Sequence, residues 1–192
     1  MDVILSNEGI DLQACDALVT GFFHDERPLR GSSGLMDWRL NGVISRFLIE
    51  KRMTGDWKET TLIPSHGTVM PTMILFLGMG SVNEYSYLRL REIFPYLLGT
   101  LMKLKTSRVC LSLPYEETYN VDCGKLAEVF IESIADCLGA DQCSLDQEWI
   151  KSLSLFLAEG EERFHEILLG VQTAQSIVEG RLNVRIFAPS AS

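Results

Sequence analysis

The sequence predicts an α/β protein, a three-layer α/β/α sandwich in which helices cover both faces of a mixed, mostly parallel sheet. Strand-like apolar runs alternate with helix-like segments along the chain. Several of these runs are apolar at nearly every position, which is typical of strands buried on both faces. Each helix-like segment has one apolar stripe, as expected for a helix that packs one side against a sheet.

The chain is long enough for one domain with a sizeable core. Its 192 residues are 46% hydrophobic and 22% charged, an ordinary globular composition. It has no internal repeat or linker, so we assign residues 1–188 to a single domain and 189–192 to a frayed tail. No apolar run approaches the roughly 20 residues of a membrane span, and Met1–Leu5 do not resemble an export signal. We therefore expect a cytoplasmic protein without a membrane partner.

The first half of the chain is expected to supply four strands and one helix. Apolar residues from Met36 to Leu48 recur at helical spacing, and Ser32 or Ser33 can cap the helix that they predict over 34–51. Apolar runs bounded by turn residues such as Pro64 and Gly67 predict the strands. These strands are expected over 1–5, 16–23, 58–63 and 72–77.

The second half is expected to supply three helices and three strands. Ser81 and Glu84 form a capping-box pattern that should open the first helix, and Pro95 should kink or split it. Phe130 lies on the apolar stripe of the second helix, as Phe47 does on the helix over 34–51, and both are expected in the core. The helices are expected over 85–104, 122–138 and 160–179, and the strands over 108–113, 152–157 and 181–187.

Charge and cysteine usage exclude several function classes. The acidic and basic side chains of residues 1–108 balance, so this part has no net charge, whereas residues 109–192 carry the whole formal charge of −9. An acidic half repels phosphate backbones, so we expect no nucleic-acid partner. The five cysteines contain no C-x-x-C pair. Glu162 and His165 have the i, i+3 spacing of di-iron ligands, but the second such motif that a di-iron site needs is missing. We therefore predict no bound metal, and thiols that behave as small hydrophobes.

Two glycine-containing loops are the candidate binding residues. Each is expected to end a strand and open a helix, where free backbone N–H groups and the helix dipole attract an anion. Because such strand ends meet at one edge of the sheet, the two loops are expected to approach each other, and if a small anion binds, it should sit there, with Arg30 as the only cation in either loop. Plain turns and caps are the alternative interpretation. The candidates are Arg30, Gly31, Ser32, Ser33, Gly34, Gly78, Gly80 and Ser81.

Two segments resemble the N-terminal domain of the leucyl aminopeptidase family. Residues 15–48 contain C-D-A-L-V-T-G-F-F and, further on, L-R-G-S-S-G-L-M-D-W-R-L-N-G-V-I-S-R-F-L. Residues 73–80, M-I-L-F-L-G-M-G, are similar to the family's strand that ends in G-L-G. The resemblance covers about residues 10–140. It implies a macrodomain-like fold, in agreement with the alternation of strands and helices.

The resemblance also bears on chemistry. The family carries its two-metal peptidase site in a separate C-terminal domain, with one Lys, three Asp and one Glu as ligands. Glu179–Leu182 matches only the end of the family's N-T-D-A-E-G-R-L motif. Macrodomains bind ADP-ribose, and the hydrolytic ones place Asn after a strand of the type D-x-x-V. Here Asp16–Val19 is followed by Thr20–Phe23 instead. We therefore expect no catalytic residue, metal or cofactor in this chain.

The expected function is that of a stand-alone, non-catalytic binding or regulatory module, a monomer or homodimer. Its partner would be an unknown protein or a small anionic ligand. The alternatives are a macrodomain-like binder or hydrolase of ADP-ribose-type ligands, and a subunit of an aminopeptidase whose metal site is supplied by another chain. A pocket that joins Arg30–Gly34 to Gly78–Ser81 would favour a ligand, whereas side chains filling that space would favour a scaffold.

Overall fold

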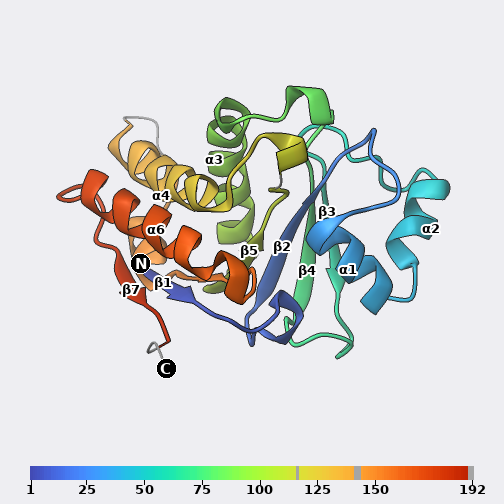
Figure 1. The fold of residues 1–192 in the computed structure, drawn as a ribbon, viewed down its shortest axis with the longest axis horizontal. Coiled ribbons are helices and arrows are strands. Elements are labelled where there is room, and N and C mark those ends of the chain that lie inside the picture. Colours follow the sequence, from blue (N-terminus) through green and yellow to red (C-terminus); the bar gives the residue numbers. More distant parts are fainter. Residues whose placement is uncertain (116, 141–143, 190–192) are drawn as a thin grey trace.

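The computed structural model describes residues 1–115, 117–140 and 144–189, and it confirms the three-layer α/β/α fold (Figure 1). One mixed sheet has the strand order β3-β4-β2-β5-β6-β1-β7. Only the edge strand β3 is antiparallel to its neighbour; the other pairs are parallel. The strands are β1 (Asp2–Leu5), β2 (Ala17–Phe22), β3 (Thr60–Pro64), β4 (Met73–Gly78), β5 (Arg108–Ser112), β6 (Ser154–Leu157) and β7 (Arg185–Phe187). Of the expected tail, residues 190–192 lie outside the described residues.

Helices cover both faces of this sheet. In Figure 1, α1 and α2 lie at the end of the molecule opposite to α4 and α6. Among the described residues, no helix is long and apolar enough to cross a membrane. The helices are α1 (Gly31–Arg39), α2 (Val43–Ile49), α3 (Tyr87–Lys103), α4 (Cys123–Gly139), α5 (Gln147–Ser152) and α6 (Phe164–Ile177).

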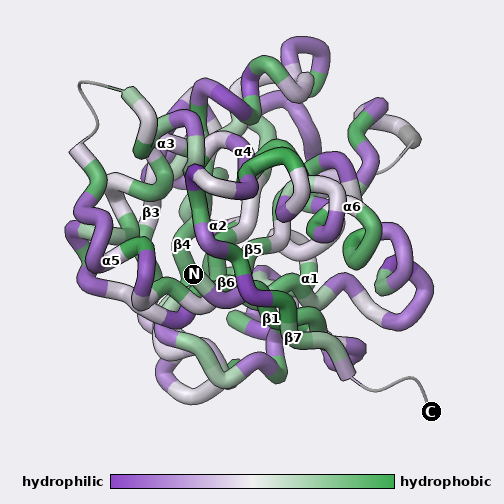
Figure 2. The backbone as a smooth tube through the Cα atoms, turned by 90° about the vertical axis from the view of Figure 1, so that its left-hand side faces the viewer, coloured by the Kyte–Doolittle hydropathy of each residue, from purple (hydrophilic) through white to green (hydrophobic). Residues whose placement is uncertain are grey.

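The alternation of side chains along the strands divides the core in two. Ala17 and Val19 of β2 pack with α3, α4 and α6, whereas Leu18 and Phe22 pack with α1 and α2. This follows from the period of two in a strand, which sends successive side chains to opposite faces. Apolar segments accordingly run through the middle of the molecule in Figure 2.

The prediction of a single helix over 34–51 is wrong, because this segment forms the two helices α1 and α2. Asn41 and Gly42 adopt positive φ angles of 54° and 74°, which end α1. The Asp37 carboxylate then accepts hydrogen bonds from the N–H groups of Ile44 (2.8 Å) and Ser45 (3.0 Å) at the start of α2. The expected caps are also wrong, since Arg30 precedes the first helical residue and no side chain caps α1.

Ser81 does not open the long helix α3. It caps the short 3-10 helix η2 (Val82–Glu84), and Ser86 caps α3 instead by accepting a hydrogen bond from Arg89 N–H. The helix α3 continues through Pro95, so the expected split is wrong as well. Pro95 is exposed. A proline ring on the solvent side of a long helix interrupts one backbone hydrogen bond without disturbing the buried stripe.

Other expectations differ in smaller ways. Phe130 is 1% exposed and belongs to the core, whereas Phe47 is only half-buried and lies under the Arg52 guanidinium, 4.0 Å from the ring centre. The short helix α5 was not expected, and β7 is shorter than the strand expected over 181–187. Of the cysteines, Cys15, Cys110 and Cys123 are buried and Cys137 is half-buried, while Cys143 lies outside the described residues.

The two ends of the described chain lie side by side on the sheet (Figure 1). Strand β1 pairs with β6 on one side and with β7 on the other. The Met1 amino group donates a hydrogen bond of 2.9 Å to the Asn183 carbonyl, and the Arg185 guanidinium pairs with the Asp2 carboxylate at 2.7 Å. Residues far apart in sequence therefore close this edge of the sheet.

Candidate functional site

A cavity of about 310 Å³ lies at the carboxyl ends of β2, β5 and β6. Its wall includes Gly21 of β2, Ser112 of β5 and Glu159, which follows β6. The carboxyl edge of a largely parallel sheet is where α/β proteins commonly bind ligands. The further lining residues are Gly9, Ile10, Glu26, Arg30, Gly31, Ser32, Ser33, Leu35, Leu113, Pro114, Tyr115, Tyr119, Ala158 and Gly160.

The start of α1 forms the part of the wall that suits an anion. Gly31, Ser32 and Ser33 line the cavity, and no side chain caps this helix. Its first N–H groups therefore remain available to an acceptor. The Ser32 hydroxyl is fixed by Thr20 Oγ1 at 2.6 Å and by the Ser112 carbonyl at 3.1 Å. These contacts tie the helix start to β2 and β5.

Arg30 is the only lysine or arginine among the described residues that line the cavity. Half of its side chain is exposed, and its Nε lies 3.7 Å from Glu26 Oε1. The Glu26 carboxylate also accepts hydrogen bonds from the Tyr119 hydroxyl at 2.8 and 2.9 Å. Arg30 is thus loosely paired and close to the cavity, where an anion can reach it.

Glu159 contributes a carboxyl group that the sequence analysis did not single out. It accepts hydrogen bonds from Ser112 and Tyr115, and its backbone forms a bridge with Gly9. Burial raises the pKa of this carboxyl from 4.5 to about 7, because the hydrogen bonds offset only part of the lost hydration. Near neutral pH, Glu159 is therefore divided between a charged and an uncharged form.

Replacing Glu159 with glutamine should stabilise the protein at high pH. The unfolded chain ionises this carboxyl above pH 4.5, but the folded chain does so only near pH 7. The contribution of Glu159 to the stability of the wild type therefore falls as the pH rises between these values and is constant above them. At pH 8 we expect Glu159→Gln to unfold with a free energy higher by up to about 3 kcal/mol, and at pH 4 the difference should vanish. Urea unfolding of both proteins at pH 4 and pH 8 measures this difference in the free energy of unfolding.

The exposed Glu161 provides a matched control two residues away. Glu161→Gln should leave both the stability and its pH dependence close to those of the wild type. Identical pH profiles for Glu159→Gln and the wild type would show that the Glu159 carboxyl is not held in the low-dielectric position described above.

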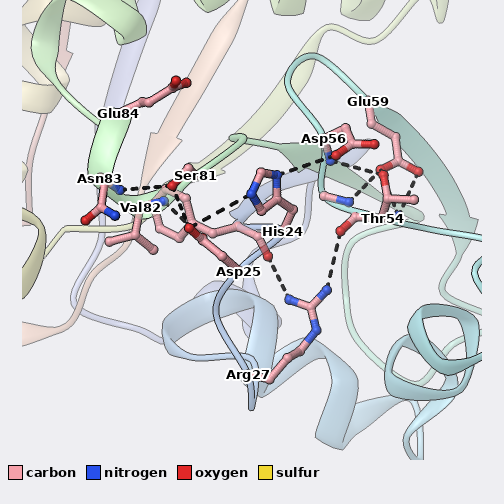
Figure 3. Close-up of polar contacts among 12 residues, drawn as sticks. His24, Asp25, Arg27, Thr54, Asp56, Glu59, Ser81, Val82, Asn83 and Glu84 are labelled. Carbon is pink, nitrogen blue, oxygen red and sulfur yellow. Dashed lines mark hydrogen bonds and ion pairs between the residues drawn. The ribbon is translucent and has the colours of Figure 1, made fainter.

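The second glycine loop, residues 78–81, is already occupied by a carboxylate of the protein itself. Asp25 accepts a hydrogen bond of 2.5 Å from Ser81 Oγ and one of 3.0 Å from Val82 N–H (Figure 3). Although partial burial alone would raise it, these bonds hold the pKa of the Asp25 carboxyl below its ordinary range. An anion arriving at this loop would have to displace Asp25.

Both glycines of this loop have structural reasons to be glycine. An added Cβ at Gly78 would overlap the Asp56 carbonyl, and Gly80 has a φ of +76°. The Gly80 N–H donates to the Gly55 carbonyl at 3.0 Å, and the Gly80 carbonyl accepts from His24 N–H at 2.9 Å. The loop is therefore a tightly bonded turn.

The structure brings together half of the predicted binding residues. Arg30, Gly31, Ser32 and Ser33 line the cavity, whereas Gly34 does not and instead packs closely against the Leu29 carbonyl. The loops 24–30 and 78–81 do meet, as the hydrogen bonds of Asp25 and His24 show. However, Gly78, Gly80 and Ser81 are not among the residues that line this cavity, so the cavity does not join the two loops.

The polar residues missed by the sequence analysis all come from strand ends or the loops after them. They are Glu26, Ser112, Tyr115, Tyr119 and Glu159. Glu159 follows the apolar run of β6 directly, and this position was the available signal. The described residues contain no group of three or more His, Cys, Asp or Glu side chains that could hold a metal.

The sheet order and the helices on both faces give this chain a macrodomain-like α/β/α fold. A Trypanosoma brucei macrodomain solved in complex with ADP has this fold, with a TM-score of 0.60 at 13% identity over 88% of this chain and 67% of that one. A mutant of tomato leucine aminopeptidase matches with a TM-score of 0.61 at 15% identity, over 94% of this chain and 37% of that one.

The chain belongs to the cytosol aminopeptidase family, whose N-terminal domain matches residues 19–137. A probable cytosol aminopeptidase of Pseudomonas syringae pv. tomato is 27% identical over 113 residues, which are 59% of this chain and 23% of the relative. A second one, from Cyanothece sp., is 25% identical over 128 residues, 67% of this chain and 25% of the relative. The chain thus spans about a quarter of the length of these relatives.

Proposed function

We propose that this chain is a non-catalytic, cytoplasmic binding or regulatory module that holds a small ligand with an anionic group in the cavity at the ends of β2, β5 and β6. The observation that carries the proposal is the uncapped start of α1, which lines this cavity beside Arg30. An anion there would accept hydrogen bonds from the first amides of α1 and a charge-assisted bond from Arg30.

A ligand of the ADP-ribose type is the second candidate. It is favoured by the likeness to a macrodomain solved in complex with ADP. The diphosphate of such a ligand would take the anion position at Gly31–Ser33. Hydrolysis of it is not part of this proposal, because the residues after β2 are Phe23 and His24 rather than asparagines.

Titration of ADP-ribose, phosphate and sulfate into the wild type and Arg30→Ala tests the proposal. A ligand at 100 times its dissociation constant adds about 2.7 kcal/mol of stability, which raises the melting temperature of a chain of this size by about 5–10 °C. We expect this shift for at least one of the three anions, and a loss of about tenfold in its affinity in Arg30→Ala.

Arg46→Ala is the matched control, because Arg46 is exposed on α2 and does not line the cavity. It should bind the anion as the wild type does. Equal and negligible shifts in all three proteins would overturn the proposal in favour of a scaffold. Turnover of leucine p-nitroanilide by the metal-loaded chain, abolished by a chelator, would contradict the non-catalytic role.

A further inference from the structure

The cavity presents both an anion-binding surface and a carboxyl group that no basic side chain neutralises. Among the described residues, no lysine or arginine forms an ion pair with Glu159, whose polar partners are Ser112 and Tyr115. Arg30 pairs instead with Glu26. A buried carboxylate without an opposite charge is costly, and a ligand that supplies the charge removes part of this cost.

We propose that the ligand of this cavity is a small zwitterion, with an ammonium group that binds the Glu159 carboxylate and an anionic group that binds Arg30 and the first amides of α1. This inference rests on the proposed function and narrows its ligand to one chemical class. The volume of about 310 Å³ lies at the lower end of the range for small-molecule pockets, which suits a compact molecule. Ser32 and Ser112 also line the cavity and add polar groups to its wall.

The ammonium contact should make binding depend on pH. The neighbours of Glu159 that act on its carboxyl, or on which its charge acts, are Ser112, Tyr115 and Cys110. Burial raises the pKa of Tyr115 and of Cys110, so neither side chain loses its proton near neutral pH. The charged groups of the loop between β2 and α1 that share the cavity are Glu26 and Arg30, and Tyr119 holds Glu26. A zwitterion should therefore bind more weakly at pH 6 than at pH 8, because Glu159 gains a proton between them.

The experiment uses ω-amino acids as probes, because the series varies the separation of the two charges. Glycine, 4-aminobutanoate and 5-aminopentanoate are titrated calorimetrically into the wild type at pH 8, beside butylamine and butanoate, which carry one charge each. At least one zwitterion should bind about tenfold more tightly than either single-charge compound. Glu159→Gln should remove this advantage and its pH dependence, whereas Glu161→Gln should retain both.

The outcomes separate this inference from the proposed function. Butanoate or phosphate binding that depends on Arg30, with no gain for any zwitterion, would overturn the inference and leave the proposed function in place. Butylamine binding as tightly as the best zwitterion would overturn it too. Absence of binding by every compound, including the phosphate and ADP-ribose of the earlier test, would overturn both. The pH dependence of the wild type tests the same contact without a substitution.

Discussion

Phe130→Ala is expected to lower the free energy of unfolding by about 3–5 kcal/mol. The Phe130 ring is 1% exposed and meets the Phe94 ring edge to face, with 4.8 Å between the ring centres and an angle of 89°. Truncation removes this contact between α3 and α4 and leaves a cavity that two long helices cannot readily close. Urea unfolding of the wild type and the variant measures the loss.

Phe47→Ala is the matched comparison, because the side chain is the same but only half-buried, beneath Arg52. We expect a smaller loss of about 1–2 kcal/mol, from partial burial and the cation–π contact. A loss below 1 kcal/mol for Phe130→Ala, or equal losses for the two variants, would mean that the pair of rings does not anchor α4.

Gly170→Ala is expected to destabilise the protein by about 3 kcal/mol or more. An added Cβ at Gly170 of α6 would overlap the backbone carbonyl of Gly124 in α4, and one at Gly124 would overlap the Glu166 carbonyl. Because the clash is with backbone rather than with a movable side chain, the two helices must separate. The cost therefore lies at or above the upper end of the usual range for overpacking.

Gly99→Ala in α3 is the control for helix propensity, because nothing lies within 4 Å of an added Cβ there. This change should be neutral or stabilise by up to about 1 kcal/mol. Thermal and urea unfolding of both variants give the comparison. If Gly170→Ala behaved like Gly99→Ala, the close contact between α4 and α6 would be disproved.

The layers and most elements could be predicted because they depend on local periodicity. The apolar stripe from Leu126 to Leu138 lies entirely within the helix that it predicts, and Asp122, where that helix was expected to begin, is its N-cap. The break between α1 and α2 depends instead on two left-handed residues, Asn41 and Gly42, within an otherwise uninterrupted stripe. The helical spacing of the apolar residues does not by itself reveal such a break, because the spacing continues across it.

The candidate site could be predicted in part, for a related reason. The residues Arg30–Ser33 were found because a loop that opens a helix is a local pattern. The role of Asp25 at residues 78–81 was missed, since it arises from a contact between residues 56 positions apart. Glu159 was missed because the environment of its carboxyl is made by Ser112 and Tyr115 on another strand and its loop.

The position of β1 in the sheet has a consequence for how the chain folds while it is being synthesised. Its partners β6 and β7 come near the other end of the chain, and the ion pair between Asp2 and Arg185 joins residues 183 positions apart. On the ribosome, β1 emerges well before β6 and β7 and stays without these partners until they have followed, whereas β2, β4 and β5 can already associate. Long-range pairing of this kind slows folding and leaves strand edges open to wrong partners. During translation, β1 is therefore the segment of the sheet that most needs protection from aggregation.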